Sequence, residues 1–327
     1  MIVQKILGNS VNKVFITGGS GFIGSHVCGL LLDQGYSVTC FDNFSNGRLE
    51  FIESLLGNPR FQLVTADCLD LPKLKTEMKG HDLVWHLAAN TDLIGSSEQP
   101  DRDLNDCIVA TFNVLEAMRH NNVNRILFSS SGAVYGRLAL DQPAMETDGP
   151  LSPMSTYAAG KIGSEALISC YCHLYGIRGW IYRFGNVIGS RMTHGVIHDF
   201  IKRLRNDETQ LLILGDGMQE KNYFLTDDCI DGMGWIFRNY ELDDENPFGI
   251  FNLGSENTTK VTEIAKIVIN AMDLTSVTEI EIEGKKFAWL GDQPRVYLNV
   301  GKVSDLGWKC PRSSTEAVFE AVNRTLS

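Results

Sequence analysis

The chain has 327 residues, of which 43% are hydrophobic and 21% are charged, a composition typical of a soluble globular protein. This length allows a large buried core and is long for a single domain, so we expect one large domain and a smaller one. The formal net charge of -11 argues against a nucleic-acid surface, because phosphate binding draws its affinity from clustered lysine and arginine.

The chain also carries no sign of a membrane or secreted protein. No apolar run reaches the roughly 18 residues that a membrane span needs, and the start Met1–Lys5 does not open a signal peptide. The eight cysteines are scattered without a Cys-x-x-Cys pair, which fits a reducing compartment. We therefore expect a cytoplasmic protein with no membrane contact and no metal site.

The first predicted strand runs into a glycine-rich turn and then a helix. The apolar run Lys13–Thr17 reads as a strand, and Phe22–Leu32 has apolar residues at helical spacing. Two glycine registers fit the turn, Gly18-x-x-Gly21-x-x-Gly24 and Gly19-x-Gly21-x-x-Gly24. Such a turn lets a pyrophosphate approach the free N–H groups at the helix start, so it predicts a bound dinucleotide.

The second predicted strand, Tyr36–Phe41, ends at Asp42. An acidic residue here hydrogen-bonds the adenosine ribose hydroxyls and repels a 2′-phosphate, so NAD is favoured over NADP. Asp42 could instead be only a turn or cap residue. The glycine turn upstream makes this alternative weaker than a role in binding the cofactor. Arg48 is the nearby cation that could argue for NADP.

Strand-like and helical segments alternate through about the first 185 residues, which predicts a parallel sheet covered on both faces. We expect an α/β fold, a Rossmann-type doubly wound parallel sheet with a smaller α/β substrate-binding domain. Residues 1–186, with a return segment near 224–254, form the expected NAD-binding domain, and 187–223 with 255–327 form the substrate domain. The further strands expected are Phe61–Ala66, Leu83–Leu87, Arg125–Ser130, Ile177–Phe184 and Gly249–Leu253, and the further helices are Leu71–Lys79, Arg102–His120, Thr156–Leu174 and one within Thr193–Asn206.

Tyr157 and Lys161 stand four residues apart in a predicted helix, so they share a face. An ammonium beside a phenol favours its ionised form and lowers a pKa that is otherwise about 10. A tyrosine in that position can act as a base near neutral pH. An isolated Tyr-x-x-x-Lys pair is more often a surface pair, so the prediction depends on the glycine turn.

With these residues in place, the chain resembles the extended short-chain dehydrogenase/reductases, and among them the nucleotide-sugar 4-epimerases of the UDP-galactose 4-epimerase type. The likeness runs nearly end to end. The stretches that carry it are Thr17–Gly24, Asp42–Ser45, Ala66–Cys68, His86–Ala89, Asn113–Ala117, Ser129–Gly136, Tyr157 with Lys161, Arg183–Gly189 and Leu306–Trp308.

The resemblance implies specific site residues. Ser131, Tyr157 and Lys161 would be catalytic, with Lys161 also holding the nicotinamide ribose. Asp67 would bind the adenine amino group, and Ala88 and Ala89 would let the cofactor pass over the fourth strand. The residues expected to contact NAD are Gly18, Gly21, Phe22, Ile23, Gly24, Asp42, Asn43, Ser45, Asp67, Cys68, Leu87, Ala88, Ala89, Tyr157 and Lys161. His86 reads as a buried structural histidine.

The substrate side rests on fewer residues. Ser131 and Asn186 would contact the sugar and the diphosphate, and Arg295 is a candidate cation because a guanidinium binds phosphate bidentately. Lys221 stands where many relatives have arginine. Val196 could line the nucleotide pocket or could pack on the surface. Counted from Gly291, Val296 occupies the place of a tyrosine that narrows the sugar pocket in relatives of narrow specificity, which predicts a wider pocket here.

The same resemblance narrows the reaction. Nucleotide-sugar dehydratases carry an acidic pair after the catalytic serine or threonine, and UDP-glucuronate decarboxylases carry a glutamate, whereas Gly132 and Ala133 stand here. The implied reaction is inversion of C4 of a nucleotide sugar, in the first place a UDP-hexose and open to N-acetylated or uronic forms. A dehydrogenase or reductase that releases reduced cofactor, and less readily a dehydratase, are the alternatives, as is a sensing protein without turnover.

Two further expectations follow from the family. Gly160 stands where relatives often have serine, and it should leave more room and slightly weaken the helix. A homodimer is expected, with the helices Arg102–His120 and Thr156–Leu174 of two subunits forming a four-helix bundle. In that bundle Val109, Phe112, Leu115 and Met118 are apolar, but they could equally face the sheet.

Overall fold

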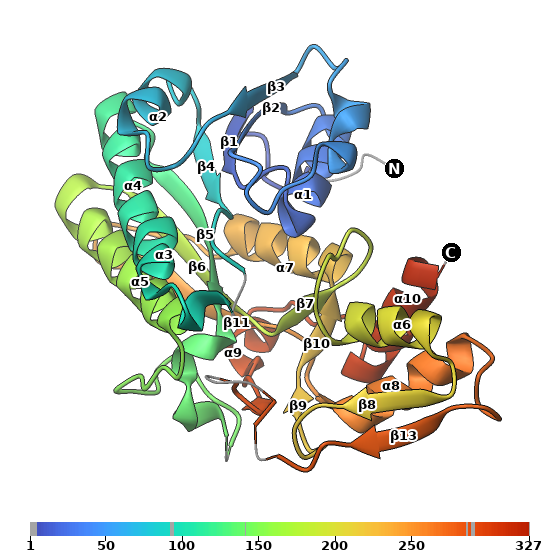
Figure 1. Ribbon diagram of the computed structural model, residues 1–327. Coiled ribbons are helices and arrows are strands. Elements are labelled where there is room, and N and C mark those ends of the chain that lie inside the picture. Colours follow the sequence, from blue (N-terminus) through green and yellow to red (C-terminus); the bar gives the residue numbers. More distant parts are fainter. Residues whose placement is uncertain (1–4, 92–94, 141, 286, 289–291, 327) are drawn as a thin grey trace. The chain divides into compact units, whose positions relative to one another are not determined.

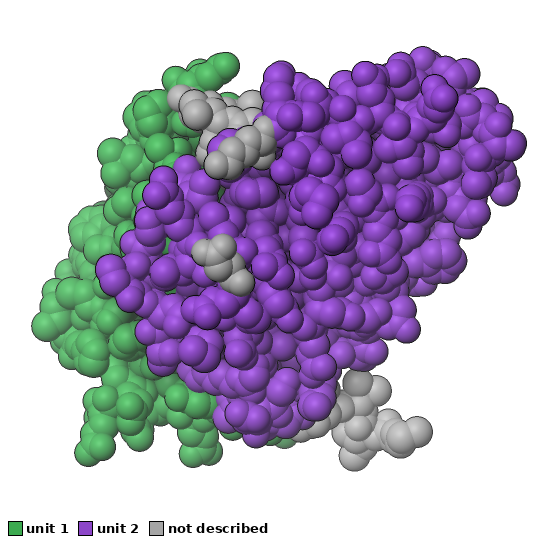
Figure 2. All heavy atoms as spheres, turned by 90° about the horizontal axis from the view of Figure 1, so that it is seen from below, with its two compact units in different colours: residues 1–134, 155–183, 233–251 green, residues 135–154, 184–232, 252–327 purple. Residues whose placement is uncertain are grey.

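The structure is a computed structural model that describes residues 5–91, 95–140, 142–285, 287–288 and 292–326. The chain forms two compact units, coloured green and purple in Figure 2. Unit 1 comprises residues 1–134, 155–183 and 233–251, and unit 2 comprises 135–154, 184–232 and 252–327. The partition differs from the expected one chiefly at 135–154, because this segment is hydrogen-bonded within unit 2. For example, the Ala144 N–H donates to Tyr297 O at 2.9 Å, and Gln293 Nε2 donates to Gly136 O at 2.9 Å.

Unit 1 is built on a sheet of seven strands in the order β11-β6-β5-β4-β1-β2-β3. The pairings of β1 with β2 and β4, of β2 with β3 and of β4 with β5 are all parallel. The strand bounds are β1 Lys13–Thr17, β2 Ser37–Asp42, β3 Phe61–Thr65, β4 Leu83–His86, β5 Arg125–Ser131, β6 Arg178–Phe184 and β11 Phe248–Leu253. The predicted Rossmann-type sheet is therefore confirmed, and each predicted strand lies within one residue of its observed bounds.

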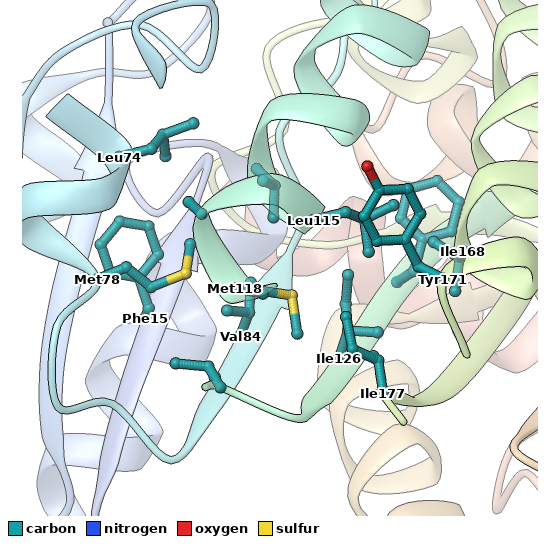
Figure 3. Packing of buried hydrophobic residues seen from close by; sticks show 14 of the residues in the cluster. Phe15, Leu74, Met78, Val84, Leu115, Met118, Ile126, Ile168, Tyr171 and Ile177 are labelled. Carbon is teal, nitrogen blue, oxygen red and sulfur yellow. The ribbon is translucent and has the colours of Figure 1, made fainter. Parts of the chain in front are cut away.

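Helices cover both faces of this sheet (Figure 1). On one face α2 (Leu71–Glu77), α4 (Ala110–Asn121) and α5 (Thr156–Tyr175) bury their apolar sides against alternate strand residues. Figure 3 shows this cluster, which includes Phe15, Leu74, Met118, Ile126 and Ile168. The other face holds α1 (Phe22–Asp33) and the C-terminal half of α7 (Thr226–Asn239), where Phe237 packs against Trp180.

The predicted helix Arg102–His120 is interrupted. It consists of a short α3 (Pro100–Asp103), a π-helical stretch η4 (Leu104–Val109) and α4. Leu115 and Met118 are fully buried against the sheet, whereas Phe112 is 42% exposed. The spacing of apolar residues could not tell whether these side chains face the sheet or a second subunit. Tertiary packing places Leu115 and Met118 against the sheet and leaves Phe112 exposed.

Unit 2 has its own core. The helices α6 (Val196–Asn206), α8 (Val261–Ala271) and α10 (Ser314–Leu326) pack around a cluster that includes Phe200, Leu211 and Ile264. Its short strands form three small sheets. They pair β7 (Asn186–Ile188) with β10 (Tyr223–Leu225), β8 (Gln210–Ile213) with β13 (Glu279–Ile282), and β9 (Glu220–Lys221) with both β12 (Thr259–Lys260) and β14 (Arg295–Val296). The short helix α9 (Gly301–Asp305) follows β14.

In the described part of the chain, no helix combines the length and the apolar character that crossing a membrane requires.

Candidate active site

The glycine turn lies where the strand order of the sheet reverses. β1 is flanked by β2 and β4, so the carboxyl ends of β1 and β4 border the crevice at which doubly wound sheets bind ligands. Gly18 has a φ of +69°, and a Cβ there would lie 2.8 Å from Ala88 N. A Cβ at Gly24 would lie 2.1 Å from Gly18 O. The three backbone segments are packed so closely that only glycine fits at these two positions.

The start of α1 supplies the amides predicted for the pyrophosphate. Gly21 is the N-cap residue, with Phe22 and Ile23 following as the first residues of the helix. The first N–H groups of a helix have no intrahelical partner and lie at the positive end of the helix dipole. The first turn holds no acidic side chain that would occupy or repel this site. An anionic pyrophosphate therefore suits this helix start.

The residues predicted for adenosine come together beside the turn. Asp42 is 7% exposed, and its two carboxylate oxygens accept the N–H groups of Ser20 and Phe44 at 2.9 and 2.8 Å. Asn43 Nδ2 donates to Asp67 Oδ2 at 2.7 Å, and Asn43 Oδ1 accepts the Ser45 N–H at 2.9 Å. Asp42 is thus a turn residue and a fixed carboxylate at once, because its hydrogen bond to Ser20 ties it to the glycine turn.

Cys68, also predicted for the cofactor, is 8% exposed and packs in the core cluster of unit 1. Burial raises the pKa of its thiol well above the usual range. A contact with NAD would therefore fall to its backbone rather than to a reactive thiolate.

The strand end beneath the cofactor position is held by a chain of buried hydrogen bonds. The N–H groups of Leu87 and Ala88 donate to Thr17, to its carbonyl at 3.1 Å and to its hydroxyl at 3.3 Å. His86 lies 2.6 Å from Thr17 Oγ1 through Nδ1 and 3.0 Å from Thr111 Oγ1 through Nε2. Burial, with the nearby Lys161 ammonium, lowers the pKa of His86 to about 3. The prediction of a buried structural histidine is confirmed. Ala89 continues this segment and is partly exposed.

Ser131, Tyr157 and Lys161 are brought together by the end of β5 and the first turns of α5. Ser155 caps α5 by accepting the Ala158 N–H at 3.2 Å. Ser131 is within hydrogen-bonding reach of the Tyr157 phenol, and its Oγ accepts the Ala133 N–H at 3.2 Å. Lys161 is 2% exposed, and its Nζ lies 5.7 Å from the centroid of the Tyr157 ring. The predicted three residues thus form one group.

The prediction that Lys161 lowers the pKa of Tyr157 is wrong for the protein without its cofactor. Burial raises the pKa of Tyr157 above its usual value, and a hydrogen bond from Ser131 opposes this shift by stabilising the phenolate. Lys161 Nζ donates instead to Ser129 O at 2.6 Å, and burial lowers the pKa of this ammonium. Water is removed from the phenolate, and the cation next to it is held by a backbone carbonyl.

A buried ion pair that sequence reasoning missed anchors α5, the helix that carries Tyr157 and Lys161. Glu165, one turn after Lys161, accepts two hydrogen bonds from Arg183 on β6, at 3.0 and 2.7 Å. The side chains of this pair are 7% and 5% exposed. Ser130 Oγ donates to the same carboxylate at 2.5 Å. Nothing in the local sequence indicates that these three residues meet.

Gly160 does not leave the open space that was expected of it. A Cβ at this position would lie 2.9 Å from Cys107 Cβ and 3.2 Å from Asp103 O. The η4 turn therefore occupies the room that a serine side chain would use.

The two cations predicted for the diphosphate lie in unit 2, on neighbouring strands. The parallel register of β9 and β14 sets Lys221 beside Val296, and Glu220 beside Arg295. Because successive residues of a strand face opposite sides, Lys221 and Arg295 lie on opposite faces of this pair. Lys221 Nζ is 3.7 Å from Asp292 Oδ1, and burial lowers its pKa.

The guanidinium of Arg295 donates to Leu140 O at 3.2 Å and stacks on Tyr297, 5.4 Å from the ring centroid. The structure therefore keeps the two cations apart, each with protein partners of its own.

Of the other predicted substrate residues, Ser131 lies in unit 1, and Asn186 and Val196 lie in unit 2. The Asn186 N–H on β7 donates to Asn222 O at 2.6 Å. Val196 begins α6 and is partly buried against the core of unit 2. Of the two roles that the sequence allowed, packing is therefore the one that the structure shows for this side chain. Val296 is 6% exposed, and Gly291, from which its place was counted, lies outside the described residues.

Asn222 is a fully buried hub that the sequence did not reveal. Its Nδ2 donates to Ser255 O at 2.8 Å and to Asn257 O at 3.0 Å, and its Oδ1 accepts the Leu298 N–H at 2.8 Å.

The chemical groups that the residues of unit 1 present match those that NAD requires. The glycine turn exposes backbone to a pyrophosphate, the Asp42 carboxylate is fixed beside it, and Lys161 lies next to Tyr157 after the carboxyl end of β5. A family model described as the NAD-dependent epimerase/dehydratase family matches residues 14–254. The chain belongs to that family.

Known proteins of similar sequence and structure span nearly the whole chain. The UDP-glucose 4-epimerase of Mycolicibacterium smegmatis is 30% identical over 95% of this chain and 97% of its own. A crystal structure of a UDP-galactose 4-epimerase is 35% identical, with a TM-score of 0.84 over 96% of this chain and 98% of that one. The UDP-glucose 4-epimerase of Thermus thermophilus, solved in complex with NAD, is 27% identical, with a TM-score of 0.83 over 96% and 99%.

Not all relatives are epimerases. UDP-glucuronic acid decarboxylase 1 of Arabidopsis thaliana is 28% identical over 84% of this chain and 62% of its own length. The chain is thus an extended short-chain dehydrogenase/reductase of the nucleotide-sugar epimerase type that uses NAD.

Proposed function

We propose that this enzyme inverts the C4 hydroxyl of a UDP-hexose through a transient 4-keto sugar. The observation that carries the proposal is the group formed by Ser131, Tyr157 and Lys161 at the carboxyl end of the parallel sheet. This group supplies one proton acceptor, one hydrogen-bond donor and one cation, which is what oxidation of a secondary alcohol requires.

The residues around this group favour simple alcohol oxidation over elimination or decarboxylation. Gly132 and Ala133 follow Ser131, so no carboxylate stands where dehydratases and decarboxylases are expected to carry one. Asp103 is a carboxylate whose charge reaches Tyr157, but its Oδ1 accepts from Asn90 at 3.0 Å and its Oδ2 from Thr156 at 2.7 Å. Both oxygens of Asp103 therefore hold structural hydrogen bonds, which makes this carboxylate poorly suited to proton transfer.

In the proposed reaction Tyr157 removes the proton from the C4 hydroxyl, while Ser131 donates a hydrogen bond to the same oxygen. NAD, when bound, accepts the hydride from C4 and returns it later. Lys161 places a positive charge beside Tyr157 and holds the nicotinamide ribose. The 4-keto sugar turns over about its diphosphate linkage and is reduced on its other face, and Tyr157 gives the proton back. Burial raises the pKa of Tyr157, and the positive charge of an oxidised nicotinamide beside the phenol would favour its ionised form.

The substrate would be held by unit 2. We propose Asn186 and Lys221 as contacts of the diphosphate, with Val196 near the nucleotide. Arg295 lies on the opposite face of β9 and β14 from Lys221, so we propose it as a cation for a different part of the nucleotide sugar. The chemistry of these groups, an amide and three aliphatic or cationic side chains on one unit, suits a nucleoside diphosphate. N-acetylated and uronic sugars remain within the proposal.

We also propose a homodimer through α5 and the η4–α4 segment. Leu104 and Phe112 are 51% and 42% exposed on one segment, and Leu174 is 64% exposed on α5. The helical segments that carry these residues lie side by side in unit 1 (Figure 1). A second copy of the chain, docked about a two-fold axis, would cover these exposed apolar side chains.

The decisive experiment uses UDP-sugars that carry deuterium at C4. Purified protein is incubated with labelled UDP-glucose, UDP-N-acetylglucosamine or UDP-glucuronate, and products are separated and weighed by mass spectrometry. An epimerase yields the C4 epimer of unchanged mass, because the same label is removed and returned. Loss of a carboxyl group would show a decarboxylase, and reduced cofactor accumulating with an oxidised sugar would show a dehydrogenase. Either of these outcomes, or no product from any sugar, overturns the proposal.

A further inference from the structure

Cys107 lies in the middle of the π-helical stretch η4, next to α5. Its side chain is 2% exposed, and its carbonyl accepts a hydrogen bond from Ser164 Oγ at 3.1 Å. Figure 1 shows α3, the segment just before η4, beside α5. A π-turn shifts the residues that follow it by one position, and such turns are frequent at functional sites. The turn is therefore fixed to the catalytic helix by a buried hydrogen bond.

Gly160 is the residue of α5 that meets this turn. It precedes Lys161 directly and lies three residues after Tyr157. A Cβ at position 160 would be 2.9 Å from Cys107 Cβ and 3.3 Å from Cys107 Sγ, closer than side chains pack. The Cys107 side chain therefore packs in the space that a side chain at position 160 would need.

The thiol of Cys107 also reaches the end of β4. Its sulfur is hydrogen-bonded by the backbone N–H of Asn90, which follows directly on Ala89. Asp103 links the same parts, because it accepts from Asn90 and from Thr156 at the start of α5. Burial raises the pKa of Cys107, so the group is a neutral thiol at neutral pH. Cys107 thus joins the strand end over which NAD is expected to pass to the helix that carries Tyr157.

We propose that Cys107 is a positioning residue, whose side chain fills the space left by Gly160 and so fixes Tyr157 and Lys161 relative to the end of β4. The inference rests on the proposed function, because it assigns the position of the proposed base. It concerns Cys107, which lies outside the Tyr-x-x-x-Lys motif, and its contact with Gly160 inside that motif.

The test is a double-mutant cycle of Gly160→Ala and Cys107→Gly. Gly160→Ala adds only the clashing methyl group, and Cys107→Gly removes the atoms that it meets. We expect Gly160→Ala to lower kcat about 100-fold with KM changed less than about threefold, because small misplacements of catalytic groups cost rates of this order. The double variant should recover to within about tenfold of the parent.

Gly163→Ala is the matched control, one turn along the same helix. Its Cβ would meet Ile108 Cδ1 at 2.7 Å, the free end of a flexible side chain on the same η4 stretch. We expect this variant to keep the parent kcat and the parent pH profile, because Ile108 can turn aside.

Two readouts do not depend on turnover of a sugar. The affinity for NAD should fall in Gly160→Ala and recover in the double variant, because Lys161 is displaced and then restored. The thermal midpoint reports whether each variant is folded. If the parent turns over no UDP-sugar, the proposed function fails, while the loss and recovery of NAD affinity still decide the role of Cys107.

Equal effects of Gly160→Ala and Gly163→Ala, or a double variant no better than Gly160→Ala, would overturn the inference. If Gly160→Ala does not fold, Cys107→Ala is compared with Cys172→Ala, since each removes a thiol that is 2% exposed. Only Cys107→Ala should lower kcat, by about tenfold, and move the pH profile of kcat/KM. The same small loss in both variants, with an unmoved pH profile, contradicts a positioning role.

Discussion

Gly18 packs directly against the backbone of Ala88 in the expected cofactor site. Replacing Gly18 with alanine tests whether this close approach constrains the site. Gly18 has a φ of +69°, and an added Cβ would lie 2.8 Å from Ala88 N and 2.9 Å from Ala88 Cα. Gly80 is a matched control in the same unit, with a φ of +74° and nothing within 4 Å of an added Cβ. Both changes therefore carry the strain of a left-handed alanine, and only Gly18→Ala adds a clash with backbone.

The expected difference follows from these two terms. A left-handed conformation costs a non-glycine residue about 1 to 2 kcal/mol, partly offset by about 0.4 to 1 kcal/mol from the less flexible unfolded chain. Gly80→Ala should therefore destabilise by between about 0 and 1.6 kcal/mol. Overpacking against atoms that cannot turn aside adds about 1 to 3 kcal/mol for Gly18→Ala.

Thermal unfolding followed by circular dichroism, on protein freed of NAD, measures this difference. The midpoint of Gly18→Ala should lie about 1.5 to 4.5 °C below that of Gly80→Ala, because a chain of this length has an unfolding entropy of about 0.7 kcal/mol per degree. NAD must also restore the native turn in order to bind, so its affinity should fall at least about tenfold, which corresponds to about 1.4 kcal/mol. If the two variants share both the midpoint and the NAD affinity, the close approach of Gly18 to Ala88 does not constrain the site.

Four further outcomes are expected. Tyr157→Phe should fold and retain NAD through purification but lose nearly all turnover, and activity within a few-fold of the parent would remove Tyr157 from its role. The thermal midpoint should fall as the pH drops from 6.5 toward 3, because burial lowers the pKa of His86 to about 3 from 6.5 and the unfolded chain binds a proton that the folded chain does not. A His86→Gln variant that keeps the same slope over this range would contradict that cause. Light scattering at micromolar concentration should show a dimer that Phe112→Asp dissociates and the comparably exposed Leu49→Asp does not, and a monomeric parent would refute the dimer. The parent should turn over N-acetylated or uronic UDP-sugars at least as well as UDP-glucose, and Val296→Tyr should narrow this range; an unchanged ratio of kcat/KM would show that position 296 is not the gate.

The local features of the cofactor site could be predicted because they depend on neighbours in sequence. The glycine turn, Asp42 at the end of β2 and the pair Tyr157 and Lys161 each follow from chain geometry over a few residues. The sheet followed too, because buried strands and amphipathic helices leave different periodicities in the sequence. The family match and the NAD complexes of related structures agree with that reading.

Tertiary structure decided what depends on residues far apart in the chain. Cys107 meets Gly160 only because η4 packs on α5, and Glu165 meets Arg183 only because α5 packs on β6. No periodicity records such a contact, since each side chain alone has many possible neighbours.

The sequence by itself determined the fold class and the cofactor, because local spacing, strand order and the family motifs specify them, and it singled out Ser131, Tyr157 and Lys161 as the residues that the structure groups together. It did not determine the protonation of those residues. The pKa of Tyr157 rises instead of falling, chiefly because burial removes water from the phenolate. A pKa depends on every charge and dipole around a group and on the water it has lost, and only the folded chain fixes those surroundings.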